Sequence, residues 1–352
     1  MARPRLWLLA GLALAWPAVA RADKYDLNLL NLCPRLPNGD CAWVRTGANG
    51  QKTVTLDSEA VSRYRSLMSE LGVVMAPRLM TPADTLGYAG FQFSAELGFT
   101  TTNPGRQLGG SSYWNGIAGV DPGNPTATRP SSTLTTVGGF VRKGLWLPIP
   151  ALEFGAGAVS LLGSHMYAIQ GYAKFALQEG FHDWVLPSLA VRGSASQLLG
   201  TGQVTMTIYG VDILISKAFS LGGTARVEPF GGWNALFIDA RSGVIDATPT
   251  CDAYAQHAAA PGSSAPGGCS ASASSASDNG TWNDLAANFT FPSQDVITRY
   301  RWSFGAKLKL SKLFLTAELD YIQHGTSHDS SADAIDASGS QWAIALSAGF
   351  DF

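Results

Sequence analysis

Apolar and polar residues alternate along the end of the chain, over residues 340–352. Every second residue from Trp342 to Phe352 is apolar, whereas the residues between them are small or polar. A strand directs successive side chains to opposite faces, so this alternation predicts one face toward lipid and one toward a lumen. The stretch therefore predicts a strand of a transmembrane β-barrel.

The same period of two recurs through most of the chain and is cleanest at residues 87–99. Nine further segments show it: 133–146, 151–163, 165–178, 184–198, 203–217, 224–240, 295–310, 312–324 and 340–352. Each is as long as, or slightly longer than, the roughly 9–11 residues that a tilted strand needs to cross a bilayer. The predicted fold class is all-β, a closed antiparallel transmembrane barrel of about ten strands, with eight or twelve as alternatives.

The connections between these segments alternate in length, as they do when short periplasmic turns alternate with longer outer loops. Short turns are expected at 147–150, 179–183, 218–223 and 311, and long loops at 101–132, 241–294 and 325–339. Two outer connections, near Ser164 and Gly200, are short. We therefore expect an uneven outer rim whose long loops meet partners outside the cell.

The start of the chain predicts export. Arg3 and Arg5 precede an apolar run, and small residues follow at Ala20 and Ala22. This is the pattern of a secretory signal peptide over residues 1–22. No later stretch reaches the roughly 18 apolar residues that a spanning helix needs. Any membrane span is therefore expected to consist of strands.

The closing strand, with Phe350 and a terminal Phe352, resembles the C-terminal signature of bacterial outer-membrane β-barrels. The resemblance is one of class and covers about residues 87–352. It implies delivery by the barrel-assembly machinery, residence in the bacterial outer membrane, and membrane lipid around the strands.

Composition favours one large sheet-rich unit, because the chain has 39 glycines, 10 tryptophans and only 14% charged residues. The net charge of -2 gives no reason to expect nucleic acid as a partner. Four cysteines form two local pairs, Cys33 with Cys41 and Cys251 with Cys269, which predict two disulfides in an exported protein. Neither pair has a CxxC spacing or a neighbouring histidine cluster, so no metal or other cofactor is expected.

Residues 23–86 do not follow the barrel period. A helix is expected at about 57–72, with Asp57 as its N-cap, an apolar stripe along one side and Gly72 at its end. Because it precedes the first strand, we expect this segment to begin in the periplasm. Two alternatives stay open: a folded cap beneath the barrel mouth, or a plug that enters the lumen.

Assigning the apolar phase of each strand to lipid leaves the other phase facing the lumen. The charged residues on that phase are Glu96, Glu153, Lys174, Arg192, Asp212, Arg226, Glu228, Arg299, Arg301, Lys307, Lys309, Glu318 and Asp320. Across the tight turn at Ser311, we expect Arg301 and Lys307 to meet acids of the next strand. Those acids are Glu318 and Asp320. Two interpretations compete, a lumen filled by paired charges and a narrow pore lined by them.

Catalysis at the outer rim is a further alternative. Ten-stranded outer-membrane barrels include the omptin proteases, and His328 beside Asp329 resembles the His–Asp pair of that family. Asp333 and Asp336 lie nearby, but a second loop with the closely spaced acidic partner pair is missing from the sequence. His324 near hydroxyl residues is too generic a signal for a rim lipase.

These observations predict a monomeric, non-enzymatic outer-membrane protein with a structural or surface-binding role. It would act through its long loops on an extracellular ligand that the sequence does not identify. A narrow passive pore or small-solute transporter is the alternative, and a rim hydrolase of omptin type comes third.

Overall fold

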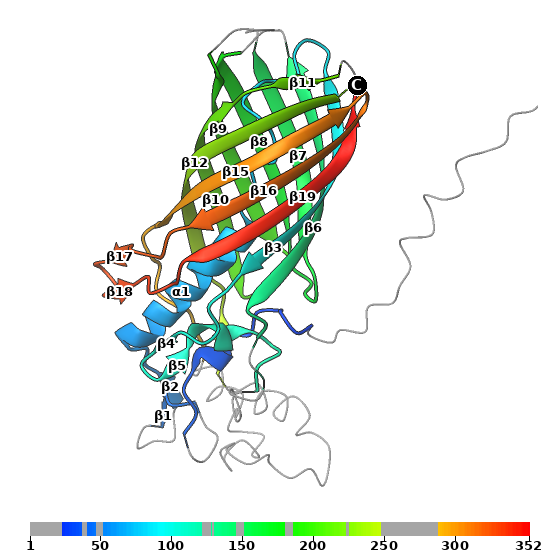
Figure 1. Cartoon of the computed structure of the whole chain (residues 1–352). Helices are drawn as coiled ribbons and strands as arrows, with labels where there is room; N and C mark the ends of the chain where they lie inside the picture. Colours follow the sequence, from blue (N-terminus) through cyan, green and yellow to red (C-terminus); the bar gives the residue numbers. More distant parts are fainter. Residues whose placement is uncertain are drawn as a thin grey trace, which may run out of the picture.

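Ten long strands form a closed ring in the part of the chain that the structure describes (Figure 1). The computed structural model describes residues 23–36, 41–46, 52–121, 128, 130–145, 151–179, 186–222, 225–247 and 288–352. The ring contains β3 (Phe91–Thr101), β6 (Thr133–Leu145), β7 (Leu152–Leu161), β8 (Tyr167–Gln178), β9 (Ser188–Leu199), β10 (Val204–Ser216), β12 (Ala225–Ser242), β15 (Ile297–Leu310), β16 (Leu313–Ile322) and β19 (Gln341–Asp351). Each strand pairs antiparallel with the next, and β19 pairs with β3. The predicted ten-stranded closed antiparallel barrel is confirmed.

The seam between the first and last barrel strands extends to the final residue. Phe352 and Phe91 exchange backbone hydrogen bonds of 2.8 and 3.0 Å. The ring of Phe352 stacks on that of Phe350, with centroids 6.2 Å apart. The short strand β11 (Phe219–Leu221) lengthens the hairpin between β10 and β12.

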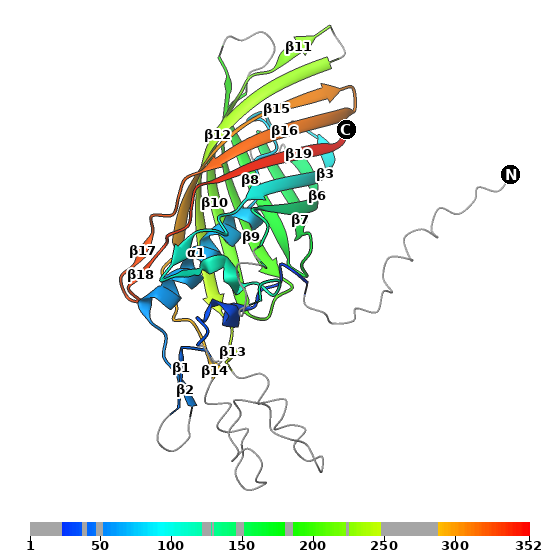
Figure 2. The same cartoon turned by 60° about the horizontal axis from the view of Figure 1, so that its bottom comes forward.

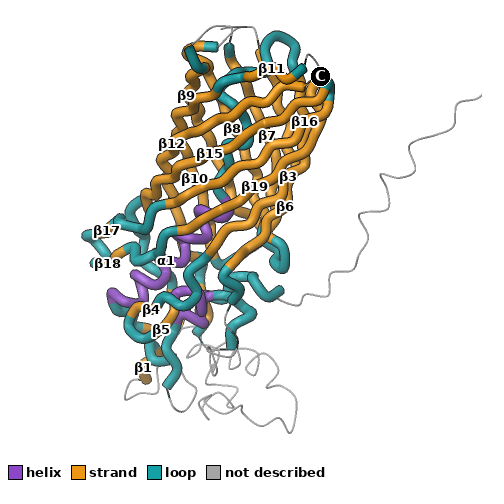
Figure 3. The backbone as a smooth tube through the Cα atoms, in the orientation of Figure 1, coloured by secondary structure: helices purple, strands orange, loops and turns teal. Residues whose placement is uncertain are grey.

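The two ends of the barrel differ, as Figure 3 shows in the tube view. We call the end that carries the C-terminus and the tight turn at Ser311 the short-turn end, and the opposite end, with the longer connections, the long-loop end. Along the strands, exposed apolar side chains such as Trp302, Ile344 and Leu346 alternate with side chains that are buried inside the barrel. The outward face is thus an apolar belt, as the period of two predicts.

The chain reaches its first barrel strand by passing through the barrel (Figure 2). The described residues of 23–57 lie at the long-loop end, where the Tyr25 N–H donates to Gly163 O at 2.9 Å. The helix α1 (Ser58–Met75) runs from there into the lumen. Residues 76–86 continue to the short-turn end, where β3 begins.

We expected residues 23–86 to begin on the side of the short turns, whereas the described part of this segment begins at the long-loop end. An extended stretch as long as residues 76–86 spans up to about 36 Å, enough to cross the barrel before β3 starts. The apolar stripe of α1 is then buried among the long loops instead of beneath the short turns. Burial of that stripe supplies the physical reason for the observed position.

The helix α1 forms where predicted. The carboxylate of Asp57 accepts a hydrogen bond of 2.6 Å from the Ala60 N–H, which caps the first turn. Gly72, expected to end the helix, lies inside it, and the helix ends at Met75, just before Pro77. A residue that precedes proline is disfavoured in the α conformation, which explains this end point. No helix in the described ranges is long and apolar enough to cross a membrane.

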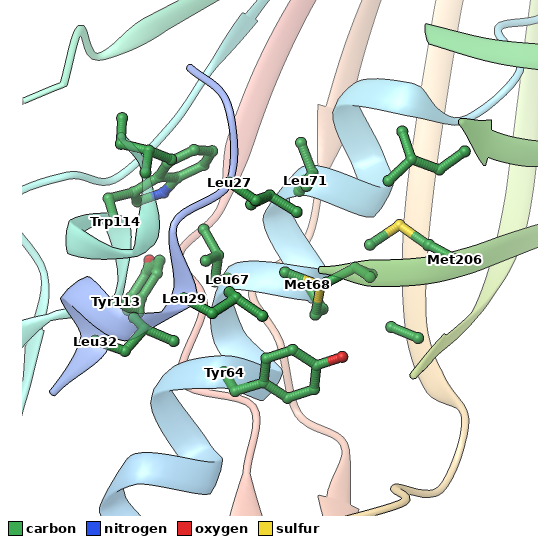
Figure 4. Close-up of a cluster of buried hydrophobic side chains, with 14 of the residues drawn as sticks. Leu27, Leu29, Leu32, Tyr64, Leu67, Met68, Leu71, Tyr113, Trp114 and Met206 are labelled. Atoms are coloured by element: carbon green, nitrogen blue, oxygen red, sulfur yellow. The ribbon is translucent and has the colours of Figure 1, made fainter. Parts of the chain in front are cut away.

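The described N-terminal residues and the described parts of the long loops fold into one unit at the long-loop end, which we call the cap. Its elements are η1 (Leu29–Leu32), β1 (Val44–Thr46), β2 (Lys52–Val54), β4 (Gln107–Leu108), β5 (Ser111–Ser112), η2 (Tyr113–Gly116), β13 (Ile245–Asp246), β14 (Asn288–Phe289), β17 (His328–Asp329) and β18 (Ala334–Ile335). Leu29, Leu67, Met68 and Trp114 belong to its apolar core, which continues into the barrel at Met206 (Figure 4).

One of the two predicted disulfides lies in the cap. Cys33 and Cys41 are bonded, with Cα atoms 5.6 Å apart, as predicted. Cys251 and Cys269 fall outside the described residues.

Candidate functional site

Most of the charged residues predicted on the luminal phase are buried. The buried ones are Glu153, Lys174, Arg192, Asp212, Glu228, Arg299, Arg301, Lys307, Glu318 and Asp320. Glu96 is partly buried, whereas the side chains of Arg226 and Lys309 expose 42% and 39% of their surface near the short-turn end. Much of this burial comes from α1 and residues 76–86, which we together call the luminal segment.

Asp212 of β10 is the centre of a buried charge network on the barrel wall. Its Oδ2 accepts from Arg192 Nε at 2.8 Å, and its Oδ1 accepts from Asn234 Nδ2 at 2.6 Å. Arg301 Nη2 lies 4.0 Å from the same Oδ1. A buried carboxylate costs free energy unless it is paired and hydrogen-bonded, and this one is both.

The same two arginines bind the luminal segment just beyond the end of α1. Arg301 Nη2 donates to Pro77 O at 2.7 Å, and Arg192 Nη1 donates to Arg78 O at 2.8 Å. The C-terminal end of a helix carries partial negative charge, so cations there are favourable. The wall arginines therefore neutralise Asp212 and hold the end of the helix at once.

Neutral wall residues bind the last helical carbonyl. Gln170 Nε2 and Ser196 Oγ donate to Met75 O at 2.8 and 3.0 Å. A helix leaves its last carbonyls without partners in the helix itself, and burial inside a barrel keeps most water from them. Side chains of β8 and β9 take the place of that water.

The carboxylates of β16 also bind the luminal segment. Glu318 accepts the backbone N–H groups of Leu79 and Met80. Asp320 accepts from Ser303 Oγ at 2.5 Å and lies 3.8 Å from Arg78 Nη1. These acids of the wall thus bind a segment that is distant in sequence.

The expected pairing of Arg301 and Lys307 with acids of the next strand is therefore wrong. The register across the Ser311 turn sets Ser303, not Arg301, opposite Asp320. Arg301 reaches across to Asp212, and Lys307 lies 3.5 Å from Asp351 at the C-terminal end of β19. The luminal segment, absent from the expectation, supplies partners for the acids of β16.

A polar pocket of about 150 Å³ lies between the luminal segment and the wall near the short-turn end. Asp84 of the segment lies 3.0 Å from Arg226, which lies 3.3 Å from Glu228. On its other side, Asp351 lies 3.0 Å from Lys309. Three acids and three bases line the pocket. The pocket is therefore a closed set of ion pairs without an excess of either sign.

Glu70 of α1 joins two long loops at the other end of the lumen. Its fully buried carboxylate accepts from Asn103 N, Tyr113 Oη, Trp114 Nε1 and Gly339 N at 3.0, 2.6, 2.7 and 3.1 Å. Burial, together with the Glu70 carboxylate, raises the pKa of Tyr113 well above its usual range. The tyrosine therefore stays protonated and donates to Glu70.

Arg299 of β15 connects the barrel wall to the same helix face. Its guanidinium donates to Ser69 Oγ at 2.8 Å, to Ser338 Oγ at 2.7 Å and to Gly339 O at 3.0 Å. Ser69 Oγ in turn donates to Asp336 at 2.7 Å. Arg299 thus connects the wall, the helix and a loop, and its guanidinium is bound to protein groups instead of lining an open channel.

The first turns of α1 are held in the same way by Arg63 and Arg65. Arg63 Nη1 donates to Leu108 O at 3.0 Å, and Arg65 donates to Asp295 O and Ser327 Oγ at 2.8 and 3.0 Å. Leu108, Asp295 and Ser327 lie in three different loops. The helix therefore binds all three long connections of the barrel.

The residues considered for rim catalysis do not form the arrangement of a protease. His328 Nε2 lies 3.8 Å from the exposed carboxylate of Asp333. Asp329 is buried and accepts from the backbone N–H groups of Ser331 and Asp295 at 2.9 and 2.8 Å. Burial alone would raise the pKa of Asp329, but these and further hydrogen bonds lower it to about 2. Asp329 therefore acts as a loop-fixing acceptor.

Several residues that fill the lumen were not predicted from the sequence. Arg142 of β6 lies on the inward phase and binds Glu96 and Ser94, so a stricter count of phases would have found it. Glu70 and Arg78 belong to the segment before the barrel, and no local pattern marks their partners. Those partners come from strands and loops far along the chain.

No protein-family model and no curated protein matches the chain. Among solved structures, it is similar to the attachment invasion locus protein Ail of Yersinia pestis, with 9% identity, a TM-score of 0.22, and coverage of 75% of this chain and 99% of that chain. The N-terminal β-barrel domain of Pseudomonas aeruginosa OprF is 11% identical over 76% of this chain and 99% of that chain, with a TM-score of 0.23. Neisserial surface protein A is 8% identical over 74% and 94%, with a TM-score of 0.25.

TM-scores of this size add nothing to what the strands themselves establish. The closed ring and its apolar belt form the architecture of a bacterial outer-membrane barrel.

Proposed function

We propose that this outer-membrane barrel is a non-conducting surface protein whose cap binds a partner outside the cell. The observation that carries the proposal is the occupied lumen, since the luminal segment has partners on the barrel wall from Ser69 to Leu86. Lys174 Nζ, for example, donates to Pro82 O and Asp84 O at 3.0 and 2.9 Å. A barrel filled in this way serves as a scaffold.

The cap is well suited to binding because it is a packed unit. Its apolar core unites η1, η2 and α1, and Glu70 and Arg299 connect that core to the loops and to the wall. A rigid platform loses less conformational entropy on binding than mobile loops would. In this proposal the N-terminal residues share the outer side with the long loops.

A labelling experiment on whole cells tests the proposed orientation. Thr55→Cys introduces an exposed thiol in the cap, and Ser220→Cys introduces a matched one in β11 at the short-turn end. A membrane-impermeant maleimide should label the first variant on intact cells and the second only after permeabilisation. The reverse pattern would refute an extracellular cap.

Conductance across a planar bilayer tests the closed lumen. The full-length protein should show no steady channels, because α1 and residues 76–86 are held by the wall. Regular channels in the unmodified protein would contradict the proposal and favour a pore.

A gated channel is the second candidate, favoured by the polar pocket beside residues 82–86. In that case the segment would leave the wall, and weakening its attachment should open a path. Arg192→Ala with Arg301→Ala removes the donors to Arg78 O and Pro77 O, whereas Arg241→Ala alters an exposed arginine at the long-loop end. Channels in the double variant alone would identify a plug. Silence in both would support the scaffold.

A further inference from the structure

A groove of about 380 Å³ lies on the outer surface of the barrel, next to the tight turn at Ser311. Four strands, β3, β15, β16 and β19, contribute to it. The small residues Ala95 and Ala348 lie between larger apolar side chains, among them Leu315 and Phe350. Its volume is within the roughly 300–1,000 Å³ of small-molecule sites.

The position of the groove determines what covers it. Ala95, Leu315 and Phe350 lie on the exposed phase of their strands, within the belt that faces the membrane. The lining of the groove is almost entirely apolar. In a bilayer, hydrocarbon is the medium in contact with this belt. The groove is thus continuous with the lipid-facing surface of the protein.

A lysine side chain lies where the groove meets the short-turn end. Lys312 is exposed and directly precedes Leu313, which lines the groove. Its Nζ lies 5.6 Å from the ring centroid of Phe352, the last residue. Lysines and aromatic rings at the end of a lipid-facing surface lie at the level of the headgroups.

We propose that the groove binds an acyl chain of one phospholipid whose anionic headgroup contacts Lys312. Ala95 and Ala348 leave the space for the chain, and the flanking Leu and Phe side chains contact it. Lys312 supplies the charge that favours an anionic headgroup over a zwitterionic one. The bound lipid comes from the leaflet at the short-turn end.

The experiment uses full-length protein in nanodiscs that contain a phosphatidylglycerol with a photoreactive acyl chain, and mass spectrometry locates the cross-links. We expect cross-links to concentrate on Leu315, Ala348 and Phe350. Ala348→Trp fills the groove and should lower their yield severalfold. Ala195→Trp, on the exposed phase of β9, should leave them unchanged.

A second variant tests the headgroup and does not disturb the barrel. Lys312→Gln should lower the preference for phosphatidylglycerol over phosphatidylcholine about fivefold, the factor expected for one lysine near an anionic surface. Cross-links spread evenly around the belt would mean exchanging boundary lipid only and would overturn the proposal.

Discussion

Gly72 of α1 and Ile238 of β12 lie so close together that a Cβ at residue 72 would be 2.6 Å from Ile238 Cδ1. The helix thus packs against the barrel wall as closely as elements pack in the core of a soluble domain. Ile238 is completely buried, and Met68 and Leu71 on the same helix belong to the same apolar cluster. The lumen at this level is therefore a packed interior.

Filling the space at residue 72 should loosen the helix. Gly72→Leu is expected to lower the free energy of unfolding by about 1–3 kcal/mol, the range for overpacked cores. Urea titration of the protein in lipid vesicles measures it. Gly193→Leu is the matched control, since a Cβ there meets no atom within 4 Å. Equal effects of the two changes would contradict the close packing of α1.

Glu70 should determine the order of the cap. Glu70→Gln keeps the size of the side chain but puts an amide where all the partners are donors, and we expect a cost of about 2–3 kcal/mol for the charged hydrogen bonds. Hydrogen exchange at the amides of Asn103 and Gly339 should accelerate, while exchange in the barrel strands stays slow. Glu59→Gln, an exposed acid on the same helix, is the control and should leave both amides protected.

A charge on the lipid face should be costly in proportion to its depth in the membrane. Leu346→Arg on β19 is expected to cost about 2–4 kcal/mol, and Tyr167→Arg at the long-loop end of β8 about 0–1 kcal/mol. Both side chains are exposed on the outward face. Folding yield into vesicles and urea midpoints would report the difference. If the two variants behaved alike, the assignment of the lipid face would be wrong.

Asp26 and His165 should make the N-terminal attachment dependent on pH. The Nδ1 of His165 lies 2.7 Å from Asp26 Oδ2, and this contact raises the pKa of His165 above 6.5. Burial alone would raise the pKa of Asp26, but hydrogen bonds from the backbone and side chain of His165 lower it below 3.8.

The protonated histidine therefore contributes stability below pH 6.5, and this stability is lost as the pH rises through its raised pKa. The ionised aspartate contributes stability above pH 3.8, and this stability is lost as the pH falls through its lowered pKa. The attachment should be strongest between these two values. An NMR titration of the imidazole should give a pKa above 6.5, and Asp26→Asn should bring it down. An unchanged pKa in the variant would rule out the pairing.

The barrel could be read from the sequence because a strand in a membrane has only two environments. Lipid on one side and protein on the other force a strict period of two, and Trp302 and Leu346 show it without any knowledge of the fold. The disulfide between Cys33 and Cys41 was equally accessible, since both residues lie within one short segment.

The contents of the lumen could not be read in the same way. Glu318 was expected to meet Arg301 or Lys307, yet it accepts from the backbone N–H groups of Leu79 and Met80. Arg192 and Lys174 do pair with acids of adjacent strands, but they also donate to backbone carbonyls of residues 78–84. The type of a residue does not indicate whether its backbone carbonyl or N–H binds a distant side chain. The charged residues were therefore placed on the correct face, but their partners in the luminal segment were not predicted.

The strands β3 and β19 close a ring around a stretch of the same chain, so ring and stretch are mechanically interlocked. At one end of the stretch is a folded cap with its own disulfide, and at the other is the first strand of the ring itself. Folding must therefore either close the seam around residues 76–86 or build the cap after they have entered. Once the seam is closed and the cap is folded, the stretch can leave the lumen only if the cap unfolds or the seam opens. This interlocking gives the stretch a kinetic stability that no single contact provides.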